Sequence, residues 1–276
     1  MATESGTWSD GPRRSRDPGA TPFPGRPTRG IGAPAALIAA IFGGIGLIVS
    51  LTGLTVQLLP RSFSAGQQHQ IMAWEVGKRW QTLPAGDIFP ASASYQLPAS
   101  ALDDVTGVNL QVARVGIAPQ APCASGTDPA AARVLGRDVC RALLRATYTD
   151  ESATYVVTVG VAVLPSADRA SAAQTALAQL AGNADTGPGV RPVAFGGTPS
   201  GQFGDGQRQI THAFSAGPYL IMYTAGYADG RPAVSIGEDS YAENEMTSAA
   251  LGAAQAVART VDAPPPAPHC PGTPGC

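Results

Sequence analysis

Residues 145–165 read RATYTDESATYVVTVGVAVLP. The dense valines of the second half favour a buried β-strand, and the polar pair Asp150 and Glu151 favours a turn in front of it. This stretch therefore predicts a β-hairpin. Pro165 and Ser166 then end the second strand and begin a helix, in which serine is the capping residue.

The segments on both sides of the hairpin alternate between strands and helices. Residues 110–118, 190–195, 209–214 and 219–227 predict further strands, and residues 128–145, 166–180 and 241–260 predict helices. Because short hairpins lie between the helices, we expect an α+β domain over residues 101–261, with about three helices packed on an antiparallel or mixed sheet. The Pro-rich residues 262–276 form neither helix nor central strand, since proline lacks the backbone donor.

The N-terminal part of the chain has a different composition. Residues 1–30 are rich in Pro, Gly and Arg, and we expect a disordered cytoplasmic tail. Residues 34–59 contain no ionisable side chain and would form a helix of about 39 Å, which predicts one transmembrane helix before the domain. A cleaved signal peptide is the rival interpretation, but its apolar region would be shorter. The arginines before this segment predict a cytoplasmic N-terminus and an extracytoplasmic domain in the cell membrane.

Residues 60–100 connect this segment to the domain. They predict a juxtamembrane helix over residues 66–83 and then an extended linker. Trp74 and Trp80 would lie near lipid headgroups, or would pack against the domain. Small residues such as Gly43 and Gly44 would allow a homodimer in the bilayer, although an Ala- and Gly-rich composition produces the same spacing by chance.

The four cysteines all follow the apolar segment. Their position predicts an oxidising compartment, and Cys123 with Cys140 and Cys270 with Cys276 is the local pairing among three formal connectivities. Metal binding is the weaker interpretation, because no C-x-x-C spacing occurs and His269 has no second ligand cluster near it. We therefore expect disulfides and no metal.

One charged pattern suggests a binding surface. Arg133, Arg137, Arg141 and Arg145 recur at every fourth residue and would share one face of the predicted helix. Such an arginine ridge would bind phosphate or carboxylate groups of lipid headgroups, wall polymers or an acidic partner. A solvated face, whose arginines pair with Asp138 or Asp150, is the alternative.

Other motifs do not indicate an active site. A net charge of −2 with 14% charged residues argues against a nucleic-acid binder. His212 stands alone in a predicted strand, without a nucleophile turn. The Gly-rich residues 196–209 lack Gly-Lys-Ser/Thr and precede a strand, so they predict a hairpin loop and not a phosphate-binding loop. No catalytic residue and no cofactor is therefore predicted.

Three segments carry a resemblance to a known group. They are WEVGKRW at residues 74–80, DIFP at residues 87–90 and TYVVTVGVAVLP at residues 154–165. Together with the apolar segment, they resemble uncharacterised single-pass membrane proteins of actinobacteria, and this resemblance implies a cell envelope. The function expected is a membrane-anchored, non-catalytic binding or scaffold module with an envelope ligand or a membrane protein as partner. An envelope hydrolase and a structural subunit of a membrane complex are the alternatives.

Overall fold

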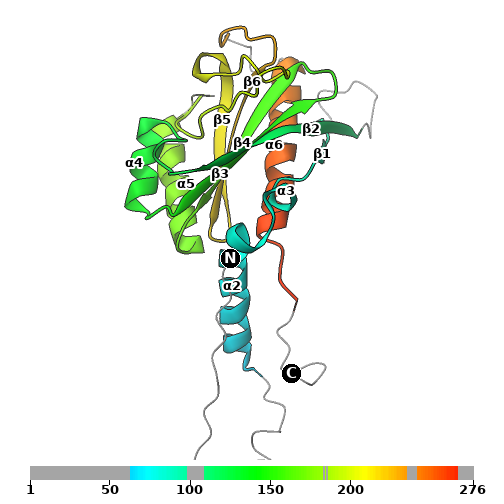
Figure 1. The fold of residues 1–276 in the computed structure, drawn as a ribbon. Helices are drawn as coiled ribbons and strands as arrows, with labels where there is room; N and C mark the ends of the chain where they lie inside the picture. The colour runs from blue at the N-terminus through cyan, green and yellow to red at the C-terminus, as the bar shows by residue number, and fades with distance from the viewer. Residues whose placement is uncertain (1–62, 98–108, 183, 185, 235–240, 267–276) are drawn as a thin grey trace, which may run out of the picture. The chain divides into compact units, whose positions relative to one another are not determined.

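The centre of the domain is a six-stranded sheet in which every strand pair is antiparallel (Figure 1). The computed structural model describes residues 63–97, 109–182, 184, 186–234 and 241–266. The strands, in the spatial order β1-β2-β3-β4-β6-β5, are β1 (Ser92–Tyr95), β2 (Leu110–Ala121), β3 (Ala142–Asp150), β4 (Tyr155–Val163), β6 (Tyr219–Tyr227) and β5 (Arg208–Ala216). The helices are α2 (Ala65–Thr82), α3 (Ala85–Ile88), α4 (Pro129–Arg137), α5 (Ala167–Ala181) and α6 (Tyr241–Val261).

The predicted hairpin is confirmed as β3 and β4, which lie in the middle of the sheet. All nine residues of β4 are buried. Helix α6 packs on one face of the strand, and on the other face Val190 and Val193 lie against Gly160 and Thr158. The turn is held by Asp150, whose carboxylate accepts hydrogen bonds from the backbone N–H groups of Ser152 and Tyr155. Local sequence therefore fixes the turn, and burial on two sides explains the run of valines.

Two separate apolar clusters hold the helices on the sheet. One face packs against α6 through residues such as Tyr148, Val159 and Met246. The other face packs against α4 and α5 through residues such as Leu135 and Leu143. Figure 1 shows this division, with α6 on one side of the sheet and α4 and α5 on the other.

Helix α2 joins the domain through its C-terminal half. The Tyr219 hydroxyl donates a hydrogen bond of 2.5 Å to the Val76 carbonyl, and Arg79 donates to the Thr260 and Val261 carbonyls. Trp80 packs against the core, whereas Trp74 is 63% exposed. The two tryptophans thus have different environments, and core packing accounts for one of them.

The α+β prediction fits this architecture, but the fold class needs a correction. No helix in the described ranges is long and apolar enough to cross a membrane. The helix predicted at residues 34–59 lies outside the described residues, as do the predicted tail at residues 1–30 and residues 267–276. Helix α2 is long enough but carries Glu75, Lys78 and Arg79. The described structure therefore corrects the fold class to an α+β domain with a six-stranded antiparallel sheet, and it gives no support to the predicted transmembrane helix.

Three predicted elements also differ from the structure. The helix that begins at Asp128 ends at Arg137, not near Arg145. Residues 190–195 form only an isolated β-bridge, between Val190 and Thr127, and no strand, because the Val193 backbone pairs instead with the side chains of Thr147 and Thr158. Residues 92–95, predicted as linker, form the edge strand β1, and the buried Phe89 precedes it.

The contact between β1 and α6 requires a glycine. A Cβ atom on Gly252 would lie 2.6 Å from the Tyr95 Cβ and 3.2 Å from the Ser94 carbonyl oxygen. We expect Gly252→Ala to lower the free energy of unfolding by about 1–3 kcal/mol in urea titrations, because β1 and α6 must separate. Gly136→Ala is the matched control, since its Cβ would meet nothing within 4 Å. It should stabilise the protein by about 0.5–1 kcal/mol, and equal losses in both variants would contradict the steric argument.

Candidate functional site: an arginine cleft beside helix α4

The disulfide prediction is confirmed for one cysteine pair. Cys123 and Cys140 are bonded to each other, with Cα atoms 6.3 Å apart. Cys123 precedes α4 and Cys140 follows it, so the bridge encloses this helix. Cys270 and Cys276 lie outside the described residues.

The predicted arginine ridge is not formed, because its helix ends too early. Arg133 and Arg137 lie on α4, Arg141 precedes β3, and Arg145 lies within β3. Val139, whose spacing from Leu135 and Leu143 would put it on the apolar face of the predicted helix, has a φ of 58° and is 61% exposed. The chain thus leaves helical geometry just after Arg137, and the four guanidinium groups are distributed over three local structures.

Arg133 instead lines a cleft at the start of α4. This hollow of about 650 Å³ lies between the beginning of α4, residues 186–188 and the beginning of β5. Its charged lining residues are Asp128, Arg133, Asp205 and Arg208. Arg145 and Arg191 do not line this hollow, but Arg191 bonds its lining residue Asp205, and Arg145 lies near Arg191. We call the hollow together with these two arginines the arginine cleft.

A largely buried ion pair forms one wall of the arginine cleft. Arg208 Nη1 lies 2.8 Å and 2.9 Å from the two carboxylate oxygens of Asp128, and the two side chains are 10% and 21% exposed. Arg208 also donates to the Gly187 carbonyl and to the Thr211 hydroxyl, and Asp128 accepts from the Gly189 N–H. The predicted position of Asp128 at the start of α4 is confirmed, but its carboxylate holds this network and makes no capping bond.

The adjoining arginines form a pair of like charges. Arg191 bonds Asp205 with its Nε and Nη2 atoms, which raises the pKa of Arg191. Arg145 is half-buried on β3, and its Nε atom is buried without a hydrogen-bond partner. Burial and then the charge of Arg191 lower the pKa of Arg145. No carboxylate among the described residues forms a salt bridge with Arg145 or Arg133.

This arrangement favours binding of an anion. The arginine cleft brings together four guanidinium groups, from Arg133, Arg145, Arg191 and Arg208, and only two carboxylates, from Asp128 and Asp205. Guanidinium groups match phosphate and carboxylate oxygens in geometry as well as in charge. A ligand with such oxygens would offset the excess positive charge.

The other sequence candidates lie elsewhere or have a different role. His212 is exposed on β5 with its ring 5.7 Å from that of Tyr223, and it does not line the arginine cleft. Within the described ranges, no three His, Cys, Asp or Glu side chains group as metal ligands. The Gly-rich residues 196–209 form a loop that ends in a short 3-10 helix and the start of β5, and they supply Asp205 and Arg208 to the cleft. Sequence reasoning missed that contribution.

Comparison of the chain with protein-family models, with curated proteins and with solved structures finds no match. The geometry of the arginine cleft is therefore the basis for a functional assignment.

Proposed function

We propose that this domain is a non-catalytic binding module of the cell envelope and that it binds an anionic ligand at the arginine cleft. The observation that carries the proposal is the pair of neighbouring arginines, Arg145 and Arg191, with the Arg145 Nε buried and unpartnered. A buried donor without an acceptor is unfavourable, and so are like charges held close together. A bound phosphate or carboxylate group would relieve both.

Two further features support this function. Both carboxylates of the cleft are occupied by arginines, Asp128 by Arg208 and Asp205 by Arg191, so neither is poised as a general base. The disulfide between Cys123 and Cys140 favours an oxidising compartment outside the cytoplasm. An extracytoplasmic ligand of acidic character is therefore the partner class that we propose.

Arg145→Met tests the role of the unpaired guanidinium group. In titrations of the full chain with inorganic pyrophosphate and with citrate at low salt, we expect about tenfold weaker binding, because a charge-assisted hydrogen bond is lost. We also expect the free energy of unfolding without ligand to stay the same or to rise, because the variant removes a partly desolvated cation beside Arg191.

Arg141→Met is the matched control for this experiment. Arg141 is exposed, lies four residues before Arg145, and belongs neither to the lining of the hollow nor to the pair of like charges that Arg145 forms with Arg191, so its loss should leave anion binding unchanged. Binding to the wild-type chain should also weaken as salt is added, since exposed charges are screened. The proposal fails if neither anion binds the wild-type chain, or if Arg145→Met and Arg141→Met bind equally well.

A further inference from the structure

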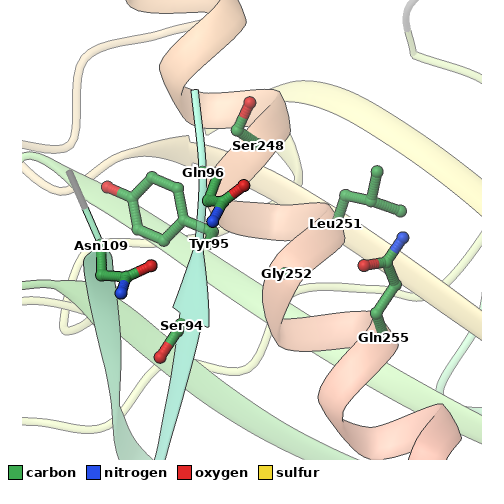
Figure 2. Close-up of a pocket in the computed structure, with 8 residues that line it drawn as sticks. All are labelled: Ser94, Tyr95, Gln96, Asn109, Ser248, Leu251, Gly252 and Gln255. Atoms are coloured by element: carbon green, nitrogen blue, oxygen red, sulfur yellow. The ribbon is translucent and has the colours of Figure 1, made fainter. Parts of the chain in front are cut away.

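A second hollow, of about 340 Å³, lies between β1 and α6 (Figure 2). Figure 2 shows the residues of its two walls: Ser94 and Tyr95 on β1, Gln96 just after β1 and Asn109 just before β2 form one, and Ser248, Leu251, Gly252 and Gln255 of α6 form the other. Because α6 and the arginine cleft lie on opposite faces of the sheet, this hollow is a separate site. We call it the amide hollow.

The lining of the amide hollow is polar but carries no charge. It contains three carboxamide side chains and two serine hydroxyls, and no Asp, Glu, Lys, Arg or His. None of these five side chains forms a hydrogen bond with another described residue. Carboxamides and hydroxyls both donate and accept hydrogen bonds, so the hollow offers both functions without a net charge.

These properties select the chemistry of a ligand. A charged ligand would meet no counter-charge, and an apolar ligand would remove water from five polar side chains without replacing its hydrogen bonds. A sugar ring suits the lining, because each hydroxyl group donates and accepts and the ring carries no charge. The volume lies at the lower end of the range for small-ligand sites.

An added peptide strand fits this position less well. The Ala91 carbonyl accepts a hydrogen bond from the Arg114 N–H on β2. Because hydrogen-bonded and non-hydrogen-bonded residue pairs alternate along an antiparallel ladder, the backbone N–H and C=O groups of Ser92 and Ser94 point away from β2. The Ser94 carbonyl, however, lies against Gly252 on α6, where even a Cβ atom would approach to 3.2 Å. Helix α6 therefore covers the edge of β1 that a peptide would need.

The site is also held in place before any ligand arrives. Tyr95 is only 6% exposed and packs into the core beneath the hollow, and Ala249 and Ala253 on α6 are fully buried. The exposed side chains of Gln96, Asn109 and Gln255 thus surround a buried base, and this base need not be formed on binding. We propose that the amide hollow binds a neutral oligosaccharide through Gln96, Asn109 and Gln255.

The test titrates the full chain with maltotriose, cellotriose and triacetylchitotriose, observed by saturation-transfer NMR. We expect at least one of these to bind the wild-type chain, and Gln255→Leu to weaken that binding about tenfold, the effect of a lost pair of hydrogen bonds. Asn109→Leu, from the other wall, should have a similar effect. Gln179→Leu is the matched control, because Gln179 is exposed on α5, and it should bind as the wild type does.

Three results would overturn the proposal. The first is that none of the three sugars binds the wild-type chain. The second is that Gln255→Leu and Asn109→Leu both bind as tightly as the wild type. Urea unfolding provides the folding control, in which both variants should be as stable as Gln179→Leu. The third is that an uncharged Ser-Ala-Thr repeat peptide binds in place of the sugars, which would assign the hollow to a peptide. Pyrophosphate binding at the arginine cleft should be unaffected by any of these variants.

Discussion

Asp128→Ala should destabilise the domain by about 3–5 kcal/mol in urea unfolding, because it leaves a buried guanidinium group without its partner. Arg208 is only 10% exposed at its side chain, and both carboxylate oxygens of Asp128 bond to its Nη1. The same substitution removes the acceptor for the Gly189 N–H. Residues 187–189, the start of β5 and the start of α4 would thus lose the hydrogen bonds to Asp128 that join them.

Two further variants separate the ion pair from other effects. Asp229→Ala breaks the Asp229–Arg231 salt bridge, whose side chains are 51% and 53% exposed, and an exposed pair should contribute less than about 1 kcal/mol. Adding Arg208→Met to Asp128→Ala should restore most of the lost stability, because no buried charge then remains unpaired. Equal effects of Asp128→Ala and Asp229→Ala would show that the Arg208 pair does not hold the cleft together.

The sequence predicted those elements whose stability is local. The β3–β4 hairpin, the cap of α5 at Ser166 and the start of α4 at Asp128 and Pro129 all depend on neighbouring residues. The Ser166 hydroxyl accepts a hydrogen bond from the Arg169 N–H, as its position predicts. The apolar pattern of residues 110–118 changes face between Val112 and Val115, and the strand has an irregularity there, between Arg114 and Gly116.

The errors occur where distant contacts override a local pattern. Leu135, Val139 and Leu143 have helical spacing, but Leu143 belongs to β3, and the bond from Cys140 to Cys123 fixes the chain just after Val139. Leu180 has helical spacing with the buried Ala173 and Leu177, which predicts a buried position, but it is 55% exposed. Strand β1 contains neither valine nor isoleucine, so only its pairing with β2 and the cover of α6 define it as a strand.

The arginine cleft could be predicted only in part. The spacing of the arginines drew attention to Arg133 and Arg145, although they do not share a helix, because α4 ends at Arg137 and Arg145 lies on β3. Arg191 and Asp205 come from a segment without a recognisable motif that ends at Arg208, the first residue of β5, and only the packing of this segment over β3 brings Arg191 near Arg145. A useful signal was the Gly-rich composition of residues 196–209, which allows the chain to approach a neighbouring surface closely.

Replacing both Cys123 and Cys140 by alanine should lower the free energy of unfolding by about 2–5 kcal/mol, the usual effect of losing a native disulfide. Helix α4 has nine residues, too few to be stable alone, but Ala131, Val134 and Leu135 remain buried without the bridge. The folded state should therefore survive, and the loss should come from an unfolded chain that gains freedom. The urea m-value should accordingly rise.

The same bridge should also control the arginine cleft, because Asp128 and Arg133 both lie inside the loop that it closes. We expect a reducing agent to shift the urea midpoint of the wild-type chain toward that of the double variant and to weaken pyrophosphate binding. The double variant is the control, since any response that it keeps must come from Cys270 and Cys276. If reduction leaves the wild-type midpoint unchanged while mass mapping shows free thiols at Cys123 and Cys140, the bridge does not stabilise the fold. The cleft would then be held by the Asp128–Arg208 pair and by packing alone, and its affinity for anions would be independent of redox conditions.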